Sequence, residues 1–291
     1  MAEDQNWDIV IQPKERLFSV DFKELWRYRD LCLLFVKRNI ITQYKQTILG
    51  PLWFVIQPAF TVIMYMIVFG GIAGIPTDGV PRPLFYLAGT AMWTYFSSCL
   101  TKTSNTFLNN AGIFGKVYFP RLVIPISDVI SNLLRLGIQF GFFAVVYIVY
   151  VIVDPTCQAH LTWYALLLPV LIVMMAGLAL GFGTIISSMT TKYRDLQVLF
   201  SFVVSLWMYA TPIVYPLSQT NSMRWMGIPV HTLMCLNPVT PVIETFKYGF
   251  LGAGAFVGWR WLIYSFVFLC LTLLVGVVVF NKVQKSFMDT V

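Results

Sequence analysis

The stretch "QYKQTILGPLWFVIQP", residues 43–58, changes from polar and basic to almost wholly apolar at the pair Gly50-Pro51. Glycine suits the left-handed backbone conformation that ends many helices. Proline suits the first position of a new helix, where its missing N–H costs no hydrogen bond. The stretch therefore predicts a corner, at which one helix ends and a second, apolar helix begins.

The composition identifies the solvent of that apolar helix. The chain is 58% hydrophobic, 16% aromatic and only 11% charged, and its mean hydropathy is +0.73. Soluble domains are about 25% charged, and a chain with so few charged residues has too little polar surface to cover a core in water. The composition therefore predicts an integral membrane protein and excludes the soluble classes.

Long apolar segments follow the corner. A helix needs about 20 mainly apolar residues to cross a membrane. We predict an all-α integral membrane fold with six transmembrane helices, at about residues 52–72, 84–101, 122–153, 161–189, 196–217 and 261–281.

The distribution of lysine and arginine predicts the orientation of these helices. Fifteen of the twenty basic residues lie before the first span, between spans two and three, between spans four and five, or after the last span. By the positive-inside rule, both termini are cytoplasmic and the loops near 73–83, 154–160 and 218–260 are outside. The net charge of +7 then reflects topology and needs no nucleic-acid partner.

Residues 21–50, ahead of the corner, have the pattern of a helix that lies in the membrane surface. Asp21 and Glu24 form a capping-box start, and apolar residues then recur at helical spacing with charged residues on the other side. We predict an amphipathic interfacial helix; the alternative is a cytoplasmic helix packed on other protein. Residues 1–20, polar and acidic and unlike a signal peptide, form a cytoplasmic N-terminal tail, and 51–291 form the six-helix transmembrane domain.

The outer segment at about 218–258 is too short and too broken to span. Pro238 and Pro241 interrupt it within "NPVTP", and glycines follow. We predict two short re-entrant helices that enter the outer leaflet and return. Glu244 is expected in the first turn of the second one, where the helix dipole favours an anion; a transport role for it is the less favoured alternative.

Catalytic chemistry is not predicted for this chain. Its two histidines lie in no metal-binding or nucleophile motif, and "GIFGKV", residues 112–117, lacks the first glycine and the Ser or Thr of a phosphate-binding loop. We predict no catalytic residue, no metal site and no cofactor in the chain. Asp128 and Arg135 share one face of the third span; they either line a polar path, or Asp128 lies at the headgroups and Arg135 pairs with another helix.

Five stretches together resemble a known family. They are "YKQTILGPLWFVIQP" (44–58), "YFPRLVIPIS" (118–127), "KYRDLQ" (192–197), "TPIVYP" (211–216) and "LNPVTPVIETFKYGFLG" (236–252). In order and spacing they resemble the membrane (permease) subunit of type-2 ABC exporters for bacterial surface polysaccharides, namely O-antigen, capsule or teichoic acid. The resemblance runs from about residue 25 to the C-terminus.

The resemblance implies a function and a set of partners. The chain would be a channel-forming permease in the bacterial cytoplasmic (inner) membrane, as a homodimer with the channel at its midline. Two copies of a separate ATP-binding subunit would handle ATP and magnesium. The substrate would be a polysaccharide on an undecaprenyl-type lipid carrier, which enters from the cytoplasmic leaflet.

The same resemblance assigns roles to residues. A coupling segment at about 109–122 and the second cytoplasmic loop would contact the ATP-binding subunit through Gly115, Lys116, Tyr118, Phe119, Arg121, Tyr193, Arg194 and Asp195. The substrate entrance at the interfacial helix would use Arg38, Tyr44, Lys45, Gly50 and Pro51. The channel candidates are Tyr65, Trp93, Tyr95, Phe96, Trp207, Tyr209 and Arg135, because sugars bind aromatic faces with polar groups beside them. The alternatives are basic residues that reach anionic headgroups and aromatic residues that face lipid.

Two other functional classes compete with export. An ion-coupled secondary transporter or channel would use Asp128, Arg135 and Glu244 as a relay, but the sequence shows no internal repeat of three helices. A membrane enzyme of glycan assembly would need a paired carboxylate or histidine site, which we do not find.

Overall fold

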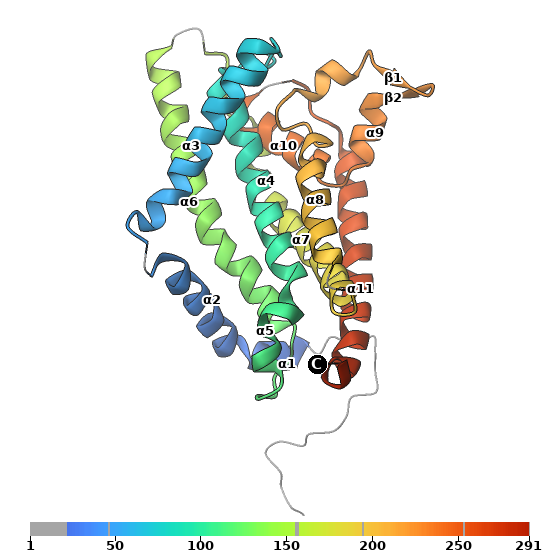
Figure 1. Ribbon diagram of the computed structural model, residues 1–291. Helices are drawn as coiled ribbons and strands as arrows, with labels where there is room; N and C mark the ends of the chain where they lie inside the picture. The colour runs from blue at the N-terminus through green and yellow to red at the C-terminus, as the bar shows by residue number, and fades with distance from the viewer. Residues whose placement is uncertain (1–21, 46, 155–156, 194, 253, 291) are drawn as a thin grey trace, which may run out of the picture.

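Long helices lie side by side along a common direction in the computed structural model (Figure 1). The structure describes residues 22–45, 47–154, 157–193, 195–252 and 254–290, without the side chains of 22, 44 and 285–290. The long elements are α3 (Trp53–Tyr65) with its π-helical extension η2 (Met66–Ile72), α4 (Arg82–Ser104), α6 (Val123–Val153), α7 (Leu168–Thr190) after the 3-10 turn η3 (Trp163–Leu167), α8 (Leu196–Tyr209) and α11 (Trp259–Thr290). The predicted N-terminal tail, Asp21 and Arg194 lie outside the described residues.

A helix occupies each of the predicted spans, which confirms an all-helical membrane fold. Among the described residues, four segments are long and apolar enough to cross a membrane: Gly50–Ile72, Val123–Val153, Trp163–Thr190 and Trp259–Gln284. The apolar helix α8 is shorter, and α4 does not meet the same criterion. The count of six transmembrane helices therefore stays a prediction.

Short elements gather at the two ends of the bundle (Figure 1). At one end lie α1 (Phe22–Arg27), α2 (Arg29–Tyr44), α5 (Thr106–Phe114) and the last turns of α11. At the other end lie the 3-10 turn η4 (Leu217–Thr220), a hairpin of β1 (Arg224–Trp225) and β2 (Ile228–Pro229), and the helices α9 (Val230–Leu236) and α10 (Thr240–Leu251). The hairpin was not predicted; its turn places Met226 and Gly227 at φ of 51° and 82°, as a tight two-residue loop requires.

The corner between the first helices has two parts. Gly50 has a φ of +48°, as predicted, and Pro51 stands near the start of the 3-10 turn η1 (Gly50–Leu52) that leads into α3. However, α2 ends at Tyr44, and Lys45 after it is extended. The prediction that the first helix continues to residue 50 is therefore wrong, since the chain leaves the helix before the glycine.

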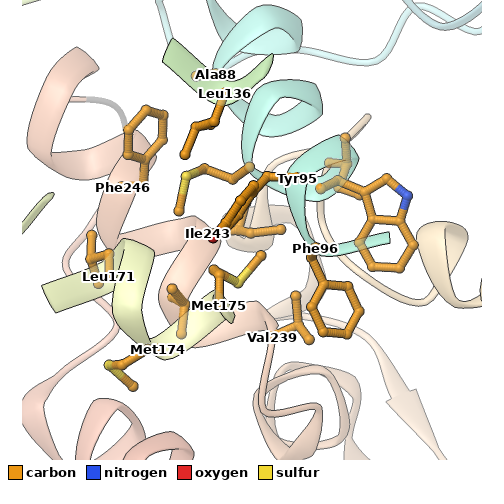
Figure 2. Packing of buried hydrophobic residues seen from close by; sticks show 14 of the residues in the cluster. Ala88, Tyr95, Phe96, Leu136, Leu171, Met174, Met175, Val239, Ile243 and Phe246 are labelled. Atoms are coloured by element: carbon orange, nitrogen blue, oxygen red, sulfur yellow. The ribbon is translucent and has the colours of Figure 1, made fainter. Parts of the chain in front are cut away.

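Two hydrophobic clusters hold the bundle together. The larger cluster joins α4, α6, α7 and α10, and Figure 2 shows Tyr95, Met175 and Ile243 of three different helices packed within it. A smaller cluster at the end that holds α2 and α5 includes Phe35, Phe107, Phe114, Phe119 and Phe280. Each end of the bundle therefore has packed apolar contacts of its own.

Glycines set the distance between α7 and α11. A Cβ on Gly181 would lie 2.9 Å from the carbonyl carbon of Thr272 and 3.0 Å from the nitrogen of Leu273, which are backbone atoms. A Cβ on Gly276 would lie 2.8 Å from the carbonyl oxygen of Gly181. The close approach that a Gly-x-x-x-Gly pair permits is thus used by Gly177 and Gly181 within the chain.

Replacement of Gly181 by alanine should destabilise the protein. The added methyl group meets backbone that cannot rotate away, and overpacking of this kind costs about 1–3 kcal/mol. The melting temperature in detergent should fall. Gly137→Ala on α6 is the matched control, because nothing lies within 4 Å of its added Cβ; equal shifts for both variants would contradict this account of the α7–α11 contact.

Candidate functional site

The coupling segment stands on an aromatic base. After α5 the chain turns through residues 115–122 into α6, and Phe119 of this turn is 5% exposed. Its ring lies 5.8 Å from the ring of Phe35 on α2 and 5.8 Å from that of Phe114 on α5. Phe107 and Phe280 stack at 4.5 Å beside them. The base therefore joins α2, α5, α11 and the turn before α6 at one place.

The predicted contact residues of this segment separate into two groups. Gly115, Lys116 and Tyr118 are exposed at the tip of the turn. Arg121 instead donates a hydrogen bond from Nη1 to the carbonyl oxygen of Gln284 at 3.0 Å, and its guanidinium lies 5.1 Å from the ring centroid of Phe114. Phe119 and Arg121 thus attach the segment to its own chain, and the tip is the part open to a partner.

The second predicted loop also presents exposed side chains. Tyr193 is 54% exposed and Asp195, just before α8, is exposed as well. Lys192 lies over the ring of Tyr193 at 5.2 Å. Arg194 lies outside the described residues, so its predicted contact stays a prediction.

A hydrogen bond attaches α2, the predicted entrance helix, to α6. Nδ2 of Asn39 donates to the carboxylate of Asp128 at 2.9 Å and lies 3.4 Å from Oγ of Ser131. Arg38 and Lys102 also interact electrostatically with Asp128. Sequence reasoning missed Asn39; its signal is the position four residues after the buried Phe35, on the same face of the helix.

The other entrance candidates lie near this contact. Arg38 and Lys45 are exposed, and the guanidinium of Arg38 lies 4.7 Å from the ring centroid of Phe35. Gly50 and Pro51 form the corner described above, and the side chain of Tyr44 lies outside the described residues. The packed face of α2 includes Leu31 and Cys32.

α2 is not amphipathic in the way that the sequence predicted. Leu33 and Leu34 are each 60% exposed, and Trp26 of α1 is 70% exposed, on faces turned away from the chain. Apolar residues thus occupy both faces of α2. One set packs on α6, and the other set is exposed.

Arg135 pairs with another helix, which is one of the two alternatives that the sequence left open. Nη1 of Arg135 donates to Oγ of Ser98 on α4 at 3.1 Å. Its guanidinium also lies 5.2 Å from the ring centroid of Phe54 on α3. Arg135 therefore joins three helices.

Three of the predicted channel aromatics lie inside the subunit. Trp93, Tyr95 and Phe96 are 6%, 1% and 0% exposed, and Figure 2 shows Tyr95 and Phe96 in the packed interior with Met175. In this structure they do not line a path open to substrate. The sequence could not distinguish this, because aromatic residues at helical spacing suit a core as well as a channel.

The other three aromatic candidates lie nearer the surface. Tyr209 is 56% exposed at the end of α8. Tyr65 is partly buried, with its hydroxyl 3.6 Å from the sulfur of Met208. Trp207 packs on Phe96 and Phe182 at 5.3 and 5.2 Å.

Asn237 joins the end of α8 to the break between α9 and α10. Its Oδ1 accepts hydrogen bonds from Nε1 of Trp207 at 3.0 Å and from the backbone N–H of Val239 at 3.2 Å. Its Nδ2 donates to Oγ1 of Thr211 at 2.9 Å and to the carbonyl oxygen of Ala210 at 3.3 Å. An asparagine amide has two acceptor and two donor positions, so this side chain uses all four.

The helices α9 and α10 on either side of the break confirm the two predicted short helices, but the position of Glu244 differs from the prediction. α10 begins at Thr240, so Glu244 lies beyond its first turn and forms an ion pair with Lys247. Lys247 is 1% exposed, donates to the carbonyl oxygen of Pro212 at 2.9 Å and lies 4.1 Å from the ring centroid of Phe85. A buried cation, and not the helix dipole, stabilises this carboxylate.

A model of the ABC-2 type transporter family matches residues 30–251. The chain belongs to this family. The match spans α2 to α10 and contains four of the five segments that carry the resemblance seen in the sequence, with all but the last residue of the fifth. It includes the α5–α6 turn, the Asn39–Asp128 contact and the α9–α10 break.

Curated relatives of this ABC-2 chain have named transport roles. It is 27% identical over 228 residues to the O-antigen export system permease protein RfbA of Myxococcus xanthus, covering 77% of this chain and 82% of the relative. A Klebsiella pneumoniae protein of the same name is 24% identical, and the match covers 89% of this chain and 94% of the relative. The polysialic acid transport protein KpsM of Escherichia coli is 22% identical, and the match covers 87% of this chain and 93% of the relative.

Removal of one member of the Glu244–Lys247 pair should destabilise this ABC-2 chain. Lys247→Met leaves a buried carboxylate without its cation, and breaking a buried pair in this way costs about 3–5 kcal/mol. The melting temperature in detergent should fall strongly. The double variant Glu244→Gln, Lys247→Met should lose less than the sum of the single variants.

The exposed Lys192 supplies the control for this double-mutant cycle. Lys192→Met should leave the melting temperature nearly unchanged. Single effects at Glu244 and Lys247 that simply add would show that the two side chains do not stabilise each other.

Proposed function

We propose that the chain is the permease subunit of an ATP-driven exporter that moves lipid-linked polysaccharide across the bacterial cytoplasmic membrane. The single observation that carries the proposal is the exposed turn with Lys116 and Tyr118, which stands on the aromatic base at the same end as α2. Family membership and the names of the relatives, which describe O-antigen export and polysialic acid transport, support it.

The turn is suited to pass on a push from a partner. A contact at Lys116 and Tyr118 moves Phe119, and Phe119 packs on α2 and α5. Because packed cores transmit displacement with little compression, the movement reaches the first corner and the end of α11. The partner in this scheme is a separate ATP-binding subunit in two copies, which holds ATP and magnesium, and the permease is a homodimer.

The entrance for substrate lies at α2 in this proposal. The exposed side chains of Trp26, Leu33 and Leu34 suit contact with lipid tails, and Arg38 and Lys45 suit the phosphates of a polyprenyl carrier. α2 leads through Gly50 into α3, so movement of the entrance helix is coupled to the first spanning segment.

An ion-coupled transporter is less well supported. Its relay would need Asp128, Arg135 and Glu244 to lie close together along one path. Glu244 is instead paired with Lys247 on α10, at the opposite end of the bundle from Asp128. Asp128 is held by Asn39, and Arg135 by Ser98.

Deletion of the gene in the native host tests the function. The cells should lose their surface polysaccharide and accumulate its lipid-linked form inside, and a plasmid copy should restore export. A plasmid copy should fail when the ATPase of the partner is inactivated by mutation. Unchanged surface polysaccharide in the deletion strain would overturn the proposal.

Lys116→Glu tests the contact with the ATP-binding subunit. Lys116 is exposed, so reversal of its charge should reduce co-purification of the ATPase, or its stimulated activity, while the melting temperature of the permease stays the same. Phe119→Ala is the contrasting variant, since it removes a ring from the aromatic base and should cost about 3–5 kcal/mol of stability. Normal coupling in Lys116→Glu would move the contact away from this turn.

A further inference from the structure

The half of α4 nearest α5 carries a polar stripe. Every residue from 94 to 105 that is not buried is polar: Thr94, Ser97, Ser98, Thr101, Lys102 and Asn105. At 3.6 residues per turn these six positions fall within about 140° of arc and extend over about 17 Å of helix. The remaining residues of this segment are buried, among them Tyr95, Phe96 and Leu100. We call the six residues the α4 stripe.

Several polar groups of the stripe have no partner within the described part of the chain. Threonine hydroxyls on α4 that are buried bond to the preceding turn, as Thr90 does to Tyr86 and Thr103 to Cys99. No such hydrogen bond engages the hydroxyl of Thr94 or Thr101 among the described residues, and Lys102 forms no hydrogen bond or ion pair with them. These groups are therefore available to a ligand.

Lipid does not fit this face. The accessible residues of α11 are of the lipid-facing kind, such as Ile263, Val267 and Leu271, which are at least half exposed. Hydroxyl, amide and ammonium groups at membrane depth would cost free energy against hydrocarbon, because no group there can hydrogen-bond to them. The α4 stripe also explains why α4 is less apolar than the other long helices.

A helix from a second copy of the chain is a less suitable partner for the α4 stripe than a hydrated ligand. The accessible faces that the chain offers on α3, α8 and α11 are apolar, with Ile63, Phe202 and Val267 as examples. On α8 the exposed hydroxyls of Ser201 and Ser205 already bond to carbonyl oxygens of their own helix. None of these faces supplies partners for the unused hydroxyls and ammonium group of the stripe.

Charge gives the stripe a direction. Lys102, near its end, interacts electrostatically with Asp128, and Arg135 also acts on Lys102. Arg38 acts on the same carboxylate. Two cations, Lys102 and Arg38, therefore act on one anion at the end near α2, and a third cation, Arg135, acts on Lys102. This excess of positive charge suits an anionic group, whereas the uncharged hydroxyls farther along suit a neutral chain rich in hydroxyls.

We propose that the α4 stripe is a wall of the transport path, at which the hydroxyl groups of the polysaccharide hydrogen-bond during export. Lys102 receives the chain at the entrance end, and the hydroxyls of Thr101 and Thr94 follow in turn along the helix. Small side chains at these positions leave room for sugar rings, and no single one holds them tightly. The proposal rests on the proposed function of polysaccharide export.

Cysteine accessibility tests whether the stripe faces water. Thr94→Cys and Thr101→Cys should react with a membrane-impermeant sulfonate thiol reagent in nanodiscs that contain the permease with its ATP-binding subunit. We expect rates at least tenfold above those of the lipid-face controls Val267→Cys and Leu271→Cys. The unmodified chain measures the background of its five native cysteines, which are buried or half-buried.

Two results of that experiment would overturn the proposal. Rates as slow as those of the α11 controls would mean that protein or lipid covers the stripe. Rapid disulfide formation between two copies of Thr101→Cys, with no reagent modification, would mean that α4 packs on α4 of a second subunit.

Loss of the hydroxyls tests transport itself. The double variant Thr94→Val, Thr101→Val keeps the shape of the side chains and should lower the export rate at least fivefold, with melting temperature and ATPase co-purification unchanged. Thr94→Ser, Thr101→Ser keeps both hydroxyls and should export at close to the normal rate. Normal export by the valine variant would overturn the proposal and leave polysaccharide export intact, whereas failure of the unmodified gene to restore export would count against the function itself.

Discussion

The structure depends most on the close contact of α7 with its two neighbours. Gly183 of α7 faces Thr103 of α4, whose hydroxyl reaches the carbonyl oxygen of Ala179 at 3.3 Å, and Gly181 faces the backbone of α11 at Thr272. In lipid the hydrophobic effect does not drive helices together, so small residues and interhelical hydrogen bonds must do so. These contacts place α4, α7 and α11 side by side, and the remaining helices pack around them.

Polar side chains then tie the two ends of the bundle to this centre. Asn39 and Asp128 attach α2 at one end, and Asn237 and Lys247 attach the α8–α10 region at the other. Because a polar group buried without a partner is costly, each of these side chains holds its neighbours in one arrangement. The α4 stripe contrasts with them, since the hydroxyls of Thr94 and Thr101 have no hydrogen-bond partner in the described part of the chain.

Much of the fold was predictable from local pattern. Hydropathy located the helices, and Pro238 and Pro241 located the break between α9 and α10, because both signals depend on residues near in sequence. The site was predicted only in part. Within the coupling segment, Lys116 is exposed while Phe119 is buried against Phe35. This difference in burial depends on α2, a helix about 80 residues away in the chain. The aromatics Tyr95 and Phe96 belong to the core for the same reason.

The sequence by itself determined the membrane class, the family, the corner at Gly50-Pro51 and the order of the helices, since composition, glycine and proline act locally. Only the tertiary structure decided which face of each helix meets protein and which is left open. Glu244 lies close to Lys247 in sequence, but only the structure shows that Lys247 is buried against Phe85 and Pro212. Because of this burial, loss of the ion pair is expected to be costly. Thr101 and Thr103 of α4 read alike in sequence, and only helix packing shows that one is exposed and the other buried.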